Sequence, residues 1–241
     1  MINSINDFYI DNFLSDFFTS LEKPSGTILD LGCGMQPYRK YYESRFSKII
    51  TADVENRSGK TDVMLTSEIL PFENEQFDLV LFTEVIEHIP DPFTAIREVS
   101  RILKPGGTLL ITWPFNYPMH EIPNDHFRYT EFQMERLLKN NEINIIRLKR
   151  RGNSWSILHT IGFQYGLNIS EFLIRIPIVG KIFIPVSWLI KKLLEFSNKI
   201  HYLIVKDFKS LNPDKTGDGL KGVMGSFAQW TLGYCVIAKK I

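Results

Sequence analysis

The chain has 241 residues, of which 44% are hydrophobic and 23% charged, a composition that fits a folded globular protein and excludes a disordered or collagen-like one. Its formal net charge is +1, so no overall electrostatic field favours nucleic acid as a partner. The two cysteines, Cys33 and Cys235, supply neither a disulfide framework nor a four-ligand zinc site, and no metal is predicted.

Residues 1–26 predict an N-terminal helical cap. The first residues lack a basic segment followed by a long apolar run, so they predict no secretory signal and favour a cytoplasmic protein. Phenylalanines recur within 5–21 and indicate a helix, which we expect to pack across the mouth of the sheet that follows.

Residues 27–150 alternate short apolar runs with helical patterns, which is typical of a parallel sheet with crossover helices. The predicted strands are 27–31, 48–53, 62–65, 77–82, 107–113 and 143–148. One helix is predicted to begin after Asp91, with Pro92 in its first turn, and another after Thr130. Helical spacing predicts that their apolar faces contain Phe93, Ile96, Val99, Ile102 and Leu103 in the first helix, and Phe132, Met134, Leu137 and Leu138 in the second.

Residues 151–231 predict a helical insertion before a last strand of the core sheet in 232–241, which we expect to pair antiparallel with 143–148. From 172 to 209 there are seven basic and two acidic residues, a net charge of 7 − 2 = +5 on a largely apolar background. Prolines and basic residues argue against a continuous membrane-spanning helix in this stretch. We favour a cap over an acceptor pocket; the alternative is peripheral contact of 172–209 with an anionic surface at the inner membrane face.

Glycines and carboxylates stand at the ends of the predicted strands, where an open α/β sheet binds its ligands. The first strand leads into Gly32 and Gly34, which allow a tight turn and a close approach of a ligand to the backbone. Pro37 stands where a dinucleotide fingerprint has its third glycine, so a nicotinamide oxidoreductase is disfavoured. The second strand ends at Asp53, whose carboxylate can accept both hydroxyls of a ribose.

Taken together, these segments resemble the class I S-adenosylmethionine-dependent methyltransferases, in particular the branch named methyltransferase type 11. The resemblance rests on the motifs at 29–34, 53, 70–72, 77–80, 84–88 and 103–107. It implies a Rossmann-like α/β sheet with helices on both faces, and S-adenosylmethionine as the cofactor. The cofactor-binding residues that it implies are Asp30 for the loop and the amino group, Gly32, Cys33 and Gly34 for the methionine part, Asp53 for the ribose, Thr66 and Ser67 for adenine, and Thr83 and Glu84 for the methionine pocket.

A histidine-rich segment follows the fifth strand and suggests the acceptor side of a reaction. His126 or His120 is the candidate general base, oriented by Asp125 or Glu121. This segment also resembles one that recurs in methyltransferases of sugar and cell-surface polysaccharide pathways. By contrast, His88 is interpreted as a structural histidine that caps or lines a turn.

The predicted function is therefore methyl transfer from S-adenosylmethionine, with oxygen as the favoured acceptor atom because of the nearby histidines. The acceptor is predicted to be a small molecule, a sugar or a lipid-linked compound. The alternative is a catalytically silent protein that binds the adenosyl cofactor as a scaffold or sensor.

Overall fold

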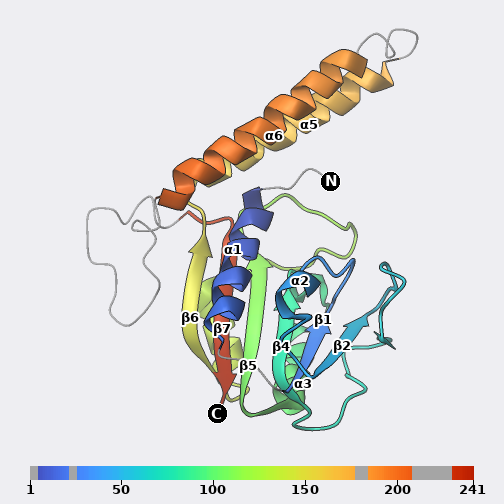
Figure 1. Ribbon diagram of the computed structural model, residues 1–241, viewed down its shortest axis with the longest axis vertical. Coiled ribbons are helices and arrows are strands. Elements are labelled where there is room, and N and C mark those ends of the chain that lie inside the picture. The colour runs from blue at the N-terminus through green and yellow to red at the C-terminus, as the bar shows by residue number, and fades with distance from the viewer. Residues whose placement is uncertain (1–4, 22–25, 177–183, 208–229) are drawn as a thin grey trace.

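The computed structural model describes residues 5–21, 26–176, 184–207 and 230–241, and shows a seven-stranded sheet in the order β3-β2-β1-β4-β5-β7-β6 (Figure 1). The strands are β1 (Thr27–Leu31), β2 (Lys48–Asp53), β3 (Val63–Met64), β4 (Phe77–Thr83), β5 (Leu103–Pro114), β6 (Ile143–Arg151) and β7 (Gly233–Lys240).

Strands β1 to β5 run parallel to one another, and β7 is antiparallel to its two neighbours, β5 and β6. In β7, Gly233 pairs with Pro114 of β5 on one side and with Arg151 of β6 on the other. The predicted parallel strands and the antiparallel pair at the end of the sheet are therefore confirmed.

Helices cover both faces of the sheet. On one face, α1 (Ile5–Ser20) and α2 (Arg39–Tyr42) bury Phe13, Phe18 and Tyr42 against β1, β4 and β5. On the other face, α3 (Pro92–Ile102) and α4 (Glu131–Lys139) pack into a larger core around β4, β5 and β7. The expectation that α1 lies across the mouth of the sheet is wrong, because its apolar side chains pack along the face. Its N-terminal end reaches that edge, where Asn6 donates to Glu84 at 3.2 Å.

The starts of α3 and α4 are capped as predicted. Asp91 accepts a hydrogen bond from the backbone of Thr94, and the hydroxyl of Thr130 accepts one from Gln133. Two predicted core residues, Phe93 and Phe132, are instead exposed. The buried face of α3 begins at Pro92 and continues at Ile96 and Val99. That of α4 begins at Glu131, which pairs with Arg150. Each phenylalanine directly follows the first buried residue of its helix and therefore faces away from the core.

The predicted insertion forms a helical hairpin of α5 (Ser154–Arg175) and α6 (Ile184–Asp207), which extends away from the carboxyl edge of the sheet (Figure 1). It does not cover the sheet as the favoured interpretation requires. Of the segment 172–209, for which membrane contact is the alternative interpretation, 177–183 and 208–209 lie outside the described residues. Within the described chain, no helix combines the length and the hydropathy needed to cross a bilayer.

The hairpin has a polar interior and an apolar exterior. Between its helices, Ser170 hydrogen-bonds to Ser187 at 2.7 Å, His159 to Ser197 at 2.9 Å, and Ser156 to His201 at 3.1 Å. Its exposed large apolar side chains are Trp155, Leu158, Ile161, Tyr165, Ile169, Phe172, Ile174, Ile184, Val186, Trp188, Leu189, Leu193, Phe196, Ile200 and Leu203. This arrangement is the reverse of the usual one for a water-exposed helix pair.

Candidate functional site

The loop after β1 turns sharply at Gly32 and is held against the end of β2. Gly32 has a φ of +73°, and a Cβ atom there would lie 2.3 Å from a methyl carbon of Val85. The backbone N–H of Gly34 donates to the Asp53 carboxylate at 2.7 Å, and the N–H of Gly32 donates to the carbonyl of Ala52 at 2.8 Å. Glycine is therefore required at position 32 by both its conformation and its contacts.

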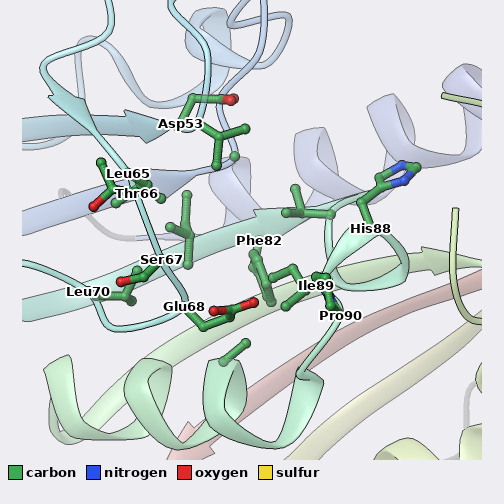
Figure 2. A pocket seen from close by; sticks show the side chains of 15 residues that line it. Asp53, Leu65, Thr66, Ser67, Glu68, Leu70, Phe82, His88, Ile89 and Pro90 are labelled. Atoms are coloured by element: carbon green, nitrogen blue, oxygen red, sulfur yellow. The ribbon is translucent and has the colours of Figure 1, made fainter. Parts of the chain in front are cut away.

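A cavity of about 440 Å³ opens beside this loop, at the carboxyl ends of β1, β2 and β4. Its size is within the range of small-molecule and cofactor sites. Figure 2 shows Asp53 near the ends of β1 and β2, and Glu68 on the opposite side near Ile89 and Pro90. The lining residues are Leu31, Gly32, Asp53, Val54, Leu65, Thr66, Ser67, Glu68, Leu70, Phe82, Val85, His88, Ile89, Pro90 and Ala95.

Four of the predicted cofactor residues line this cavity, namely Gly32, Asp53, Thr66 and Ser67. Its walls are otherwise mostly apolar. Glu68 adds a second carboxylate that the sequence motifs did not single out, although its position directly after Thr66 and Ser67 was a usable signal.

Asp30, Cys33, Gly34 and Thr83 lie next to the cavity without lining it. Asp30 is 1% exposed and accepts a hydrogen bond from the Tyr42 hydroxyl; its burial raises the pKa of Asp30 to about 6. Cys33 is also buried, and its burial raises the pKa of the thiol to about 11. Asp30 and Cys33 are therefore buried rather than part of the cavity wall.

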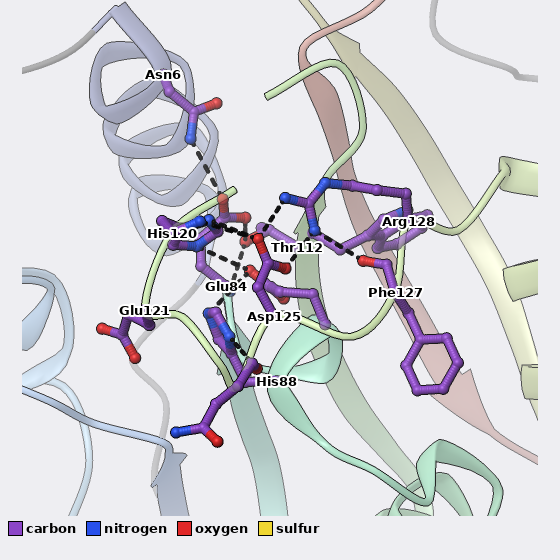
Figure 3. A network of polar contacts seen from close by, with 12 residues as sticks. Asn6, Glu84, His88, Thr112, His120, Glu121, Asp125, Phe127 and Arg128 are labelled. Carbon is purple, nitrogen blue, oxygen red and sulfur yellow. Dashed lines mark hydrogen bonds and ion pairs between the residues drawn. The ribbon is translucent and has the colours of Figure 1, made fainter. Parts of the chain in front are cut away.

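Glu84 is engaged in a polar network at the end of β4 rather than in the cavity wall. Its carboxylate lies 2.9 Å from the guanidinium of Arg151, and it accepts hydrogen bonds from the Thr112 hydroxyl at 2.7 Å and from the Asn6 amide at 3.2 Å (Figure 3). The side chain of Glu84 therefore ties together α1, β4, β5 and β6.

The histidine-rich segment brings together two of the three predicted catalytic residues. The Nδ1 atom of His120 lies 3.3 Å from the carboxylate of Asp125, which also accepts the backbone N–H of His120 at 3.0 Å (Figure 3). Arg128 donates to Asp125 at 2.7 Å and holds the pKa of that carboxyl well below its usual range. His126 does not join them: its side chain is exposed, beside Phe127. Nor does the alternative partner Glu121, which pairs with Arg57 at 2.8 Å.

His88, which the sequence suggests is structural, lies at this site. The short helix η1 (Ile86–His88) places it on the cavity wall, with its ring centroid 4.8 Å from that of His120. Glu87, completely buried, lies between them: its Oε1 atom is 3.7 Å from Nε2 of His88 and 3.9 Å from Nε2 of His120. The adjacent Glu87 and His88 at a strand end were the sequence signal for this cluster.

The cavity suits an adenosyl cofactor on the evidence of its own residues. Asp53 lines the cavity with a carboxylate that can bind a ribose, and the backbone of Gly32 forms part of the cavity wall. Apolar side chains such as Leu65 and Phe82 supply surface for a flat base.

Comparison with known families agrees with this geometry. Residues 29–111 match the family model described as a methyltransferase domain. The resemblance to S-adenosylmethionine-dependent methyltransferases is therefore confirmed: these residues form a methyltransferase domain, and S-adenosylmethionine is the cofactor of its class.

Among curated proteins, the chain is similar to the ubiquinone/menaquinone biosynthesis C-methyltransferase UbiE of Pseudoalteromonas translucida (strain TAC 125). The identity is 36% over 72 residues, which cover 30% of this chain and 28% of that protein. Matches to such C-methyltransferases reach 56% of the relative's length, in Shewanella baltica. The chain thus spans between about a quarter and somewhat more than half of the curated relatives it matches.

Solved structures share the fold over almost the whole chain. A phosphoethanolamine N-methyltransferase 2 of Haemonchus contortus, in complex with phosphomonomethylethanolamine and S-adenosylhomocysteine, has a TM-score of 0.52 at 17% identity, covering 96% of this chain and 52% of that one. The [4+2]-cyclase SpnF has a TM-score of 0.57 at 16% identity, covering 96% and 79%. The Rossmann-like methyltransferase fold is confirmed, and at these identities the likeness concerns the fold alone.

Proposed function

We propose that this chain, which contains a methyltransferase domain, transfers a methyl group from S-adenosylmethionine to an oxygen atom of a small-molecule, sugar or lipid-linked acceptor. The observation that carries the proposal is the cavity at the strand ends. It is lined by Gly32 and Asp53, both of which lie within the segment 29–111 that matches the methyltransferase domain. The histidine and carboxylate groups beside it favour an oxygen acceptor.

The residues proposed to hold the cofactor are those that form this cavity. Asp53 would accept the ribose hydroxyls, the backbone at Gly32 would lie against the methionine part, and Thr66 with Ser67 would face the adenine. When bound, S-adenosylmethionine supplies a methyl group activated by its positively charged sulfur.

The acceptor side is proposed at His120 and Asp125. Because Arg128 keeps Asp125 ionised, this carboxylate can orient the His120 ring through Nδ1 and leave Nε2 directed toward the cluster with His88. In this position His120 would accept the proton of an acceptor hydroxyl.

Calorimetric binding of S-adenosylmethionine and S-adenosylhomocysteine tests the cofactor site, with NADH as a ligand that should not bind. We expect Asp53→Ala to weaken binding of both adenosyl compounds at least about tenfold, since it removes a charge-assisted pair of hydrogen bonds. Glu55→Ala is the matched control, because Glu55 is an exposed carboxylate on the same loop. Absence of binding to the folded wild-type protein would contradict the proposal.

The same fold occurs in the cyclase SpnF, so the fold by itself does not dictate methyl transfer. The alternative of a silent adenosyl-binding scaffold predicts cofactor binding without turnover of any acceptor. The cluster of His120, Asp125 and Glu87 beside the cavity supports an enzyme, because a scaffold has no use for interacting ionisable groups next to its ligand.

We also propose that the hairpin of α5 and α6 contacts the surface of an anionic membrane, which would suit a lipid-linked acceptor. Its serines and histidines face each other while aromatic and aliphatic side chains such as Phe172 and Trp188 face outward. Exposed Lys192 and Lys199 on α6 supply positive charge for anionic headgroups.

Co-sedimentation with liposomes at low salt tests this contact. We expect wild-type protein to bind vesicles that contain anionic phospholipid, and Phe172→Asp combined with Trp188→Asp to weaken binding at least about tenfold through the loss of buried apolar area. Asn168→Asp is the control: it adds a single negative charge at an exposed polar position of α5 without removing an apolar side chain. It should bind vesicles almost as the wild-type protein does. Failure of the wild-type protein to sediment would refute the contact.

A further inference from the structure

The cluster of Glu87, His88 and His120 has the composition of a metal site, although no metal is expected from the sequence. One carboxylate oxygen and two imidazole nitrogens lie within 4.8 Å of one another. We propose that these three side chains bind a divalent first-row transition-metal ion at the wall of the cofactor cavity.

The hydrogen bonds of the two histidines leave the Nε2 atom of each ring free to bind a metal ion. Nδ1 of His88 lies 2.9 Å from the carbonyl oxygen of Asn124, so it carries the proton and donates it. Nδ1 of His120 lies 3.3 Å from the carbonyl oxygen of Pro118 and 3.3 Å from the Asp125 carboxylate, two acceptors that likewise place its proton on Nδ1. Both Nε2 lone pairs then face Glu87, and outer partners of this kind are typical of metal-binding histidines.

The burial of Glu87 is independent evidence for a bound cation. Its side chain is 0% exposed, and neither of its carboxylate oxygens has a hydrogen-bond partner among the described residues. A buried carboxylate without a partner is costly, whereas a bound cation satisfies both its charge and its oxygen lone pairs.

The distances require a modest contraction on binding. Two ligand atoms on one such ion are about 3.0–3.4 Å apart for bonds of about 2.0–2.2 Å, compared with 3.7 and 3.9 Å from Glu87 Oε1 to the two imidazole nitrogens. His120 is on a partly exposed loop, so its ring can approach without disturbing the core. Nitrogen and oxygen donors suit Zn²⁺, Co²⁺ or Mn²⁺, and three protein ligands leave a coordination position open.

The role of the ion rests on the proposed function, whereas its binding does not. Because His88 lines the cavity, an ion on its Nε2 atom would stand at the cavity wall and could hold an acceptor oxygen. Nε2 of His120 would then be a metal ligand, and the ion would replace His120 as the group that activates the acceptor.

The test is titration of chelator-treated protein with Co²⁺, followed by its visible absorption and by calorimetry. We expect one ion per chain, and we expect Glu87→Gln and His120→Asn each to weaken binding at least about tenfold. His126→Asn is the matched control, because His126 is an exposed histidine of the same loop and should leave binding unchanged. Melting curves check folding, and His120→Asn keeps the test usable if the buried Glu87→Gln does not fold.

No binding of Co²⁺ at about 1 mM, a concentration that fills even weak ion sites, would overturn the inference, as would binding that survives in both variants. S-adenosylmethionine calorimetry on the same samples separates the two proposals. Cofactor binding without Co²⁺ binding refutes the metal site alone; Co²⁺ binding without cofactor binding refutes the proposed function alone.

Discussion

The guanidinium of Arg151 lies 2.9 Å from the carboxylate of Glu84, although the two residues are 151 − 84 = 67 positions apart in the chain. Arg151 ends β6 and is 1% exposed, while Glu84 directly follows β4. The pair therefore connects the outer strand of the sheet to the strand that forms the middle of the candidate site.

Removal of this connection should be costly. We expect Arg151→Ala to lower the free energy of unfolding by about 3–5 kcal/mol, because it leaves the Glu84 charge without its partner in a largely buried setting. Urea denaturation measures the effect. Arg39→Ala removes an arginine from the exposed pair with Glu43 and should cost no more than about 1 kcal/mol. Equal losses of unfolding free energy in the two variants would show that the pair of Arg151 and Glu84 stabilises the protein no more than an exposed pair does.

Gly32→Ala should reduce both stability and cofactor binding. The alanine Cβ would meet Val85 at 2.3 Å in a backbone with positive φ, and we expect a loss of about 2–4 kcal/mol from strain and overpacking. Gly59→Ala is the control for backbone strain alone, since Gly59 has a φ of +69° and open space at its Cβ position. The difference between the two variants measures the steric contribution of Val85. Thermal unfolding and S-adenosylmethionine calorimetry check both effects, and similar losses in the two variants would rule out the contact with Val85 as the cause.

Asp30→Asn should stabilise the protein at neutral pH. Burial raises the pKa of Asp30 from 3.8 to about 6, so the folded state holds this carboxyl in an unfavourable charged form above pH 6. The variant should therefore gain about 2–3 kcal/mol above pH 6, a gain that disappears below about pH 4 where the carboxyl is neutral in both states. Unfolding free energies measured across this range provide the check; a less stable variant at pH 7 would contradict it.

Acidification should weaken the pairing of α5 and α6. Burial, and then the nearby His159, lower the pKa of His201 from 6.5 to about 4. The neutral ring favours the folded state fully above pH 6.5, and this contribution is lost as the pH falls toward 4, because the unfolded chain takes up the proton first. We expect a loss of about 1–2 kcal/mol, discounted for partial exposure.

Thermal unfolding at pH 7 and pH 4.5 measures this loss, with His201→Gln as the variant that should flatten the pH dependence. The groups that face His201 are Ser156 and His159 on α5, and Tyr9 of α1 contacts Ser156. His126→Gln removes an exposed histidine and should retain the wild-type profile. An unchanged profile in His201→Gln would assign the acid sensitivity to other groups.

The centre of the sheet was predictable because β1, β2, β4 and β5 each contain a short apolar run, and β1 and β2 end at a glycine turn and a carboxylate, respectively. The tight turn after β1 was also predictable, since its backbone requires glycine at position 32 and Asp53, at the end of β2, accepts the N–H of Gly34. Phe93 and Phe132 could not be placed, because helical spacing in the first turn does not tell which of two neighbouring positions faces the sheet.

The acceptor side was harder to predict for a different reason. His120, His126 and His88 have equivalent chemistry in the sequence, and their grouping depends on how a loop folds over the end of β4. That loop directs His120 toward Glu87 and leaves His126 exposed. Likewise, composition indicated the apolar and basic character of the hairpin but not that its polar side chains would face each other.

The pairing of Arg151 with Gly233 has a consequence for how this fold can change. The strands that flank the hairpin segment are antiparallel neighbours, so the segment leaves the sheet and returns to it at one point, and none of its described residues lines the cavity. A short turn could join β6 to β7 there in place of residues 153–230, since Thr231 and Leu232 still hydrogen-bond to Arg151 of the sheet. We therefore expect that the hairpin could be lengthened, replaced or deleted while the seven-stranded sheet keeps its register.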